Sequence, residues 1–152
     1  MKLEIRKLGH SEKPPMDLLL KADPSEAMIE KYLYAGECYI AEAEDNIIGV
    51  FVLLPNSVHE IELMNISVLD KYQHQGVGKD IIKFVARIAK LEGYEDLIVK
   101  TADVSKDAQE FYKKMKFEYD FTVKGYFIQY YEEPIMENGQ QAIDQIVLRK
   151  KL

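Results

Sequence analysis

Cysteine, glycine, proline and long apolar runs are all scarce in this chain of 152 residues. The single cysteine, Cys38, cannot form an internal disulfide, which suits a reducing compartment. The 8 glycines and 5 prolines are too few for a collagen-like or low-complexity chain. No run of 18 apolar residues suggests a membrane span, and the first residues lack the apolar segment of a signal peptide. We therefore expect a single domain over residues 1–152, located in the cytoplasm and without a membrane partner.

Positive charge is also in deficit, with 20 Lys and Arg residues against 26 Asp and Glu residues. Nucleic-acid binding needs a basic surface for phosphate contacts, so no nucleic-acid partner is expected. A cleft lined with carboxylates concentrates cations, so the charge balance favours a cationic small molecule or a lysine-bearing partner. Three isolated histidines and one cysteine offer no ligand spacing, and no metal site is expected.

Hydrophobic periodicity predicts antiparallel strands in the first half of the chain. Apolar residues that nearly alternate with charged ones predict a first strand over 3–8. Asp23, Pro24 and Glu26 are typical of a helix start with Asp23 as the N-cap. The buried stripe of that helix is predicted to be Ala27, Met28, Tyr32 and Leu33. Three apolar stretches separated by turn residues, at 38–43, 47–54 and 60–68, then predict a meander.

The second half of the chain alternates strands with helices. Apolar residues at helical spacing predict a helix over 76–92, ended by Gly93, and a second helix over 105–115. Strands are predicted at 96–101, 117–131 and 143–148, with a loop at 134–140. This order predicts an α+β fold, in which a mixed, mainly antiparallel sheet lies between helices in three layers.

The segment Gln73-His74-Gln75-Gly76-Val77-Gly78-Lys79 lies between a predicted strand and the long helix. Its two glycines let the backbone approach a ligand closely, and free N–H groups at a helix start attract anions. A P-loop would need Gly at position 73 and Ser or Thr at position 80, and a dinucleotide fingerprint would need Gly at position 81. Neither pattern is present. The segment therefore predicts a different phosphate or pyrophosphate site, or a plain strand-to-helix turn.

The same segment resembles the Gln/Arg-x-x-Gly-x-Gly/Ala motif of the GNAT superfamily of acyl-CoA-dependent N-acetyltransferases. Ser105–Phe117 is similar to a second motif of that family, Asn-x-x-Ala-x-x-Phe-Tyr-x-x-x-Gly-Phe. Two positions depart from it, because Ser105 stands where the family often has Asn and Lys116 replaces Gly. The resemblance covers residues 39–119. It implies the GNAT fold, acetyl-CoA as co-substrate, and direct transfer of the acetyl group to a primary amine.

The resemblance also implies which residues bind the coenzyme. The pyrophosphate group is expected at Gln73, His74, Gln75, Gly76, Val77, Gly78 and Lys79. The pantetheine arm is expected along Ile66, Ser67 and Val68, with Ser105 taking part in place of the family's Asn. Backbone N–H groups, where the strand at 66–68 diverges from its neighbour, are expected to stabilise the oxyanion.

Acetyl transfer needs a base, because a primary amine is protonated at neutral pH. Glu60 and Glu62 occupy alternate strand positions and are expected to share one face. The resemblance favours Glu62 as the base, although Glu60 or a water molecule is an alternative, and both carboxylates fit plain surface residues. Tyr112 is expected to bind near the thioester and to protonate the leaving thiolate, since a phenol is protonated at pH 7. A core tyrosine fits the same position.

The acceptor amine cannot be identified from the sequence. A small molecule is favoured, while a protein N-terminus or lysine, or a non-catalytic module that binds coenzyme A, are the alternatives. The aromatic and acidic stretch Tyr126–Pro134 is expected to border the acceptor cleft, because aromatic faces and carboxylates suit a cation. Asn65 is expected to line the acceptor site. Exposed C-terminal strands can pair two subunits into a homodimer.

Overall fold

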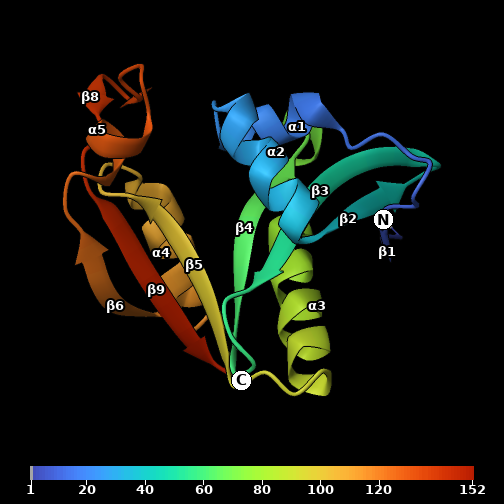
Figure 1. The fold of residues 1–152 in the computed structure, drawn as a ribbon. Helices are drawn as coiled ribbons and strands as arrows, with labels where there is room; N and C mark the ends of the chain where they lie inside the picture. Colours follow the sequence, from blue (N-terminus) through green and yellow to red (C-terminus); the bar gives the residue numbers. More distant parts are fainter. Residues whose placement is uncertain (1) are drawn as a thin grey trace.

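The computed structural model describes residues 2–152, which form a seven-stranded sheet and a two-stranded one (Figure 1). The large sheet has the order β1-β2-β3-β4-β5-β9-β6, and β7 pairs with β8. The strands are β1 (Glu4–Lys7), β2 (Glu37–Ala43), β3 (Asn46–Pro55), β4 (Glu60–Val68), β5 (Asp96–Ala102), β6 (Glu118–Val123), β7 (Met136–Glu137), β8 (Gln140–Gln141) and β9 (Gln145–Lys151). Within the large sheet only the pair of β4 and β5 is parallel. The predicted α+β fold with a mainly antiparallel sheet is confirmed.

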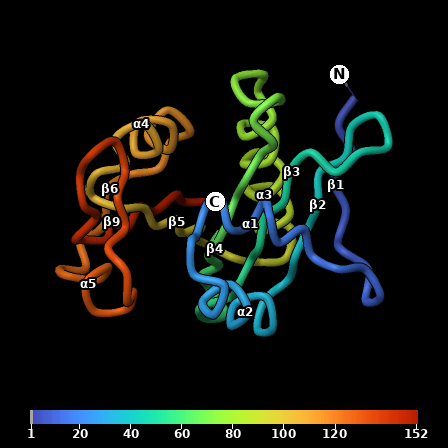
Figure 2. Tube along the Cα trace, turned by 90° about the horizontal axis from the view of Figure 1, so that it is seen from above, coloured from blue at the N-terminus to red at the C-terminus, as the bar shows by residue number. Residues whose placement is uncertain are grey.

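Helices cover both faces of this sheet. Their bounds are α1 (Met16–Ala22), α2 (Glu26–Ala35), α3 (Val77–Leu91), α4 (Lys106–Lys114) and α5 (Tyr126–Tyr130), with a 3-10 turn at Asp70–Tyr72. Figure 2 shows α2 and α3 on opposite sides of β2, β3 and β4. In residues 2–152 no helix combines the length and the apolar character that crossing a membrane requires.

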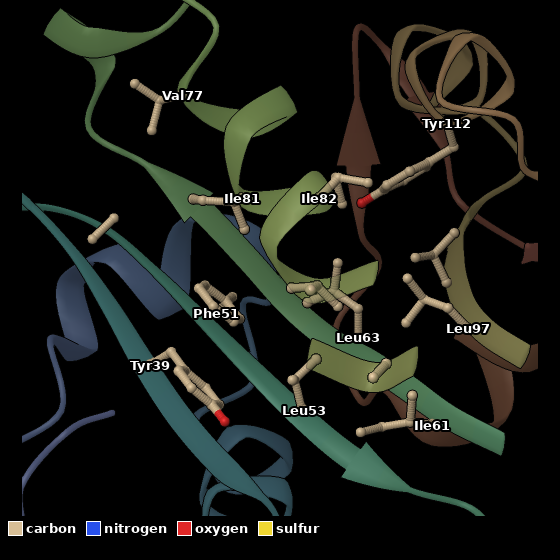
Figure 3. Close-up of a cluster of buried hydrophobic side chains, with 14 of the residues drawn as sticks. Tyr39, Phe51, Leu53, Ile61, Leu63, Val77, Ile81, Ile82, Leu97 and Tyr112 are labelled. Atoms are coloured by element: carbon tan, nitrogen blue, oxygen red, sulfur yellow. The ribbon is translucent and has the colours of Figure 1, made fainter. Parts of the chain in front are cut away.

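Two apolar clusters hold these layers together. Leu19 of α1 and Ile29 of α2 pack against Ile40 and Val50 on one face of the sheet. The larger cluster, on the other face, joins α3 and α4 to the strands (Figure 3). Its members include Phe51, Ile81, Val85 and Leu97, all fully buried. Burial of each such side chain contributes about 1.5–3 kcal/mol, so the packing of α3 fixes where its N-terminus lies.

The sheet opens into two arms at β4 and β5. These strands pair only where residues 60–63 face residues 96–99, and the remaining parts separate (Figure 1). β1 to β4 form the N-terminal arm, and β5, β9 and β6 form the C-terminal arm. Residues 64–68 of β4 therefore have a partner strand, β3, on one side only.

The start of α2 differs from the prediction. The N-cap is Ser25, whose Oγ accepts a hydrogen bond from Met28 N–H at 3.2 Å, while Asp23 accepts one from Ser25 N–H at 3.1 Å. Because the helix begins two residues later than predicted, its inward side also changes. Ile29 and Tyr32 are buried, whereas Ala27 is exposed.

Three short elements were not predicted. α1 follows the prolines at 14–15 directly, and no element is predicted from the sequence over its seven residues. The predicted strand at 117–131 ends at Val123, because Gly125 turns the chain with a φ of +67° and α5 begins there. In α5 the aromatic rings of Tyr126 and Tyr130 contact one another at helical spacing, with centroids 4.9 Å apart and ring planes tilted by 44°. The predicted loop at 134–140 contains the small β7–β8 hairpin, turned by residues 138–139 with positive φ.

Candidate functional site

The glycine segment forms a sharp turn into α3. His74 and Gly76 both have positive φ, and Gly76 at +84° is the N-cap of the helix. The first hydrogen bond of the helix runs from Asp80 N–H to the Gly76 carbonyl at 3.0 Å. The N–H groups of residues 77–79 are therefore without an acceptor in the described chain. Three adjacent free donors at a helix start are a good site for a phosphate group.

Side chains in this segment brace the turn and leave its backbone free. Gln73 Nε2 donates to the Val68 carbonyl at 3.1 Å and to Asp70 Oδ1 at 3.2 Å. Gln75 Nε2 donates to the Lys71 carbonyl at 2.9 Å. Lys79 is exposed, and across residues 2–152 it has no carboxylate within ion-pair distance. Its charge can therefore reach an anion bound at the turn.

The open side of β4 offers main-chain groups next to this turn. Leu69 N–H donates to the Ile48 carbonyl at 2.8 Å, which fixes the alternation of hydrogen-bonded pairs along the β3–β4 ladder. Ser67 accordingly points its main-chain groups toward β3, and Ile66 and Val68 point theirs toward the gap between the arms. A bulge at Met64, which has no register partner in β3, marks the place where β4 bends away. The predicted divergence of this strand is confirmed.

Glu60 and Glu62 lie on one face of β4, as predicted. Asn56 Nδ2 donates to a carboxylate oxygen of each, at 3.1 Å in both cases. Their surroundings differ, because Glu60 pairs with Arg149 at 2.9 Å and Glu62 with Lys100 at 3.0 Å. The Glu62 side chain is only 5% exposed and lines a cavity between the arms, which Glu60 does not.

This cavity, hereafter the acceptor cavity, has a volume of about 220 Å³. Its polar lining comes from both arms and comprises Asp23, Tyr32, Glu62, Lys100, Thr101, Ser105, Tyr126, Tyr131, Glu137 and Gln145. One hydrogen bond, from Tyr131 O–H to Asp23 Oδ1 at 2.9 Å, joins the arms above it. Tyr126 lines the cavity together with Asp23 and Glu62, and burial, followed by the negative charges of these two carboxylates, raises the pKa of Tyr126.

Asn65 does not line the acceptor cavity, contrary to the prediction. Its side chain is buried and donates to the Leu19 carbonyl at 3.0 Å and to Tyr32 Oη at 2.9 Å. Several cavity residues were missed by sequence reasoning, above all Asp23, Lys100 and Glu137. Asp23 was interpreted as a helix cap, and nothing local distinguishes the other two from surface charges.

Tyr112 lies in the core at the end of α4, only 8% exposed. Its ring makes edge contacts with Phe111 and Phe117, each at 5.4 Å between centroids, and Figure 3 shows the hydroxyl pointing toward Ile82 of α3. Burial raises the pKa of Tyr112 to about 12, so the phenol stays protonated at neutral pH. Ser105, just before α4, donates from Oγ to Glu137 Oε1 at 2.9 Å, so its hydroxyl faces the acceptor cavity.

A comparison with protein families and known structures identifies the arrangement. The family described as Acetyltransferase (GNAT) domain matches residues 35–119. The chain belongs to this family. It is 36% identical to the uncharacterized N-acetyltransferase YvbK of Bacillus subtilis, over 87% of this chain and 85% of that protein. The resemblance stated from the two motifs is thereby confirmed.

Two similar crystal structures contain the coenzyme. A GNAT family acetyltransferase from Elizabethkingia anophelis with acetyl-CoA bound has a TM-score of 0.97 and 37% identity, covering 99% of this chain and 98% of that one. A Bacillus subtilis acetyltransferase in complex with CoA has a TM-score of 0.92 and 34% identity, covering 99% of both chains. The protein is an acetyl-CoA-dependent N-acetyltransferase of the GNAT type.

Proposed function

We propose that this enzyme acetylates a small primary amine held in the acceptor cavity, with Glu62 as the base and Tyr112 as the acid. The observation that carries the proposal is the position of the Glu62 carboxylate, which is nearly buried and lines a cavity at the split between β4 and β5. An acetyl group that enters from the coenzyme side of this split would meet an amine that enters from the other.

The coenzyme is assigned to the turn before α3 and to the open side of β4. Free N–H groups of residues 77–79, together with the charge of Lys79, support a pyrophosphate site there. Ile66 and Val68 direct main-chain groups into the gap, where the amide groups of pantetheine can pair as a strand would. The Val68 carbonyl already accepts from Gln73, so Ile66 supplies the free carbonyl of the two.

We propose the following sequence of steps. Glu62 takes a proton from the ammonium group, directly or through a water molecule, and the neutral amine attacks the thioester carbonyl carbon. The carbonyl π electrons move to oxygen, and N–H groups on the open side of β4 stabilise this oxyanion. The nitrogen of this tetrahedral intermediate then loses its second proton to water. When the intermediate collapses, the C–S bond breaks, Tyr112 donates its proton to the thiolate, and water reprotonates the phenolate. No acyl-enzyme forms, because the amine attacks the thioester itself.

A hydrogen bond across the acceptor cavity favours a small acceptor over a polypeptide. The hydrogen bond between Tyr131 and Asp23 joins the arms, and both side chains are half-buried. An extended polypeptide laid between the arms would have to break this contact, whereas a small amine would not. The volume of about 220 Å³ also suits a small molecule.

The test is release of free coenzyme A thiol from acetyl-CoA in the presence of different acceptors. Small primary amines should support release well above the rate without acceptor, and peptides with a free N-terminus or lysine should not. Equal or faster release with peptides would show a protein acetyltransferase. Release that no acceptor stimulates, with coenzyme A still bound, would show a non-catalytic module.

A further inference from the structure

The acceptor cavity holds more negative charge than catalysis by one base requires. Three carboxylates line it, those of Asp23, Glu62 and Glu137, against a single cation, Lys100. Lys100 Nζ lies 3.0 Å from Glu62 Oε1, so the charge of Lys100 is balanced by that carboxylate. For Asp23 and Glu137, no Lys, Arg or His nitrogen of the described residues lies within 4.0 Å.

From this we infer that the preferred acceptor is a diamine, whose second ammonium group binds between Asp23 and Glu137 while its first reacts beside Glu62. The inference rests on the proposed function and names its substrate class. A zwitterionic amino acid would bring its own carboxylate into a cavity that already has three. A monoamine would leave two carboxylates without a counter-charge.

Asp23 is built into the cavity wall and held in one orientation. Oδ1 accepts from Ser25 N–H at 3.1 Å and from Tyr131 O–H at 2.9 Å, and Oδ2 accepts from Tyr32 O–H at 3.0 Å. Tyr32 is itself fixed by Asn65, whose amide donates to it at 2.9 Å. All of these donors are neutral, so they orient the carboxylate without cancelling its charge.

The aromatic lining strengthens the same preference. Tyr32, Tyr126 and Tyr131 line the cavity together with Asp23, and aromatic faces attract ammonium groups. Burial and the charge of Asp23 raise the pKa of both Tyr32 and Tyr131, so these phenols remain neutral. Within residues 2–152 the one side-chain donor to Glu137 is the Ser105 hydroxyl, which is also neutral.

A longer diamine has room beyond the cavity. A groove of about 540 Å³ continues from it between α2 and the segment after α5, and the two share Pro24, Met28, Tyr131 and Ile135. Its charged lining is Lys31, Glu132 and Glu133, which again leaves an acidic excess. Extending the carbon chain therefore need not abolish binding.

The test compares three acceptors with the same number of carbon atoms: a linear α,ω-diamine, the monoamine and the ω-amino acid. The diamine should show a kcat/KM at least about tenfold above the monoamine, with the amino acid lowest. Asp23→Asn and Glu137→Gln should each reduce the diamine-to-monoamine ratio through KM for the diamine, with little change in kcat. Glu30→Gln, an exposed carboxylate on α2, is the matched control and should keep the ratio.

Two results would overturn the inference while leaving the proposed function intact. One is a wild-type kcat/KM for the monoamine or amino acid that equals that for the diamine. The other is a diamine-to-monoamine ratio of kcat/KM that is unchanged in both Asp23→Asn and Glu137→Gln. The two substitutions lie in different parts of the chain, so the test still stands if one variant misfolds. If no amine is acetylated, the proposed function fails instead. Calorimetric titration of the CoA complex with diamine and monoamine then still decides the preference.

Discussion

Lys100 Nζ lies 3.0 Å from Oε1 of Glu62. Glu62 is within the region where β4 pairs with β5, and Lys100 is the first residue of β5 beyond it. The ion pair connects the two arms of the sheet, and both of its residues line the acceptor cavity. Because Asn56 donates to the same carboxylate, Glu62 is fixed by two donors from different parts of the chain. Its carboxylate is therefore oriented before any amine arrives.

Glu62→Gln should lower kcat by about 10²–10⁴ at neutral pH, because the amide cannot accept the ammonium proton. Initial rates of thiol release with a saturating small amine measure the effect. Glu60→Gln is the matched control, since Glu60 lies on the same strand face but pairs with Arg149 outside the cavity. If the two variants lose activity equally, the assignment of the base to Glu62 is wrong.

Tyr112 should make the protein less stable at high pH. Burial raises the pKa of Tyr112 from 10.0 in the unfolded chain to about 12 in the folded protein. As the pH rises, the phenol therefore ionises first in the unfolded chain, and the free energy of unfolding falls. The stability is complete below pH 10 and is lost between pH 10 and 12, by about 2–3 kcal/mol. Urea unfolding of wild type and Tyr112→Phe at pH 8 and pH 11 measures this, and the variant should lose less. A loss of the same size in both would show that Tyr112 does not cause it.

The two glycines of the turn should respond differently to alanine. Gly76→Ala places a side chain at a φ of +84°, which should cost about 1–2 kcal/mol of folding free energy. Gly78→Ala lies within α3, where a Cβ would meet Phe111 Cζ at an ordinary 3.6 Å, and should be neutral or stabilise by up to about 1 kcal/mol. Both should weaken coenzyme A binding, since both alter the donor surface of the turn. Thermal unfolding and calorimetry separate the two effects.

Gly93→Ala serves as control for this pair. Gly93 lies beyond the other end of α3, with a φ of +94° and open space around the position of a Cβ. It should lose stability as Gly76→Ala does and keep coenzyme A affinity. Reduced affinity in Gly76→Ala and Gly93→Ala, with unchanged affinity in Gly78→Ala, would mean that binding follows stability and not the turn.

The sequence predicts those parts of the molecule whose determinants are local. The strands at 37–68 and the helix over 77–91 follow from periodicity, and the glycine turn before α3 follows from residues that are adjacent in the chain. Local patterns fail where a distant residue decides the outcome. The aromatic stretch after Gly125 alternates enough to predict a strand, but Asp144 accepts from Gly125 N–H at 2.9 Å and helps to hold the turn into α5.

The acceptor cavity could not be assembled from the sequence for the same reason. Asp23 and Tyr131 lie 108 positions apart, and their contact depends on how the two arms of the sheet diverge. Lys100 meets Glu62 only because β4 and β5 are parallel neighbours. Their strand positions made Glu60 and Glu62 candidates for the base, and the family resemblance favoured Glu62, whereas the residues that surround Glu62 required the fold.

These assignments depend on binding of the acetyl-CoA pyrophosphate by main-chain N–H groups at the start of α3, which we propose. Amide chemical shifts of Val77, Gly78 and Lys79 test it most directly, recorded with coenzyme A and with pantetheine, which lacks the phosphates. We expect large chemical-shift changes of these three amides with coenzyme A and small changes with pantetheine. Shifts of equal size with both ligands, or none with coenzyme A while it is bound, would contradict it.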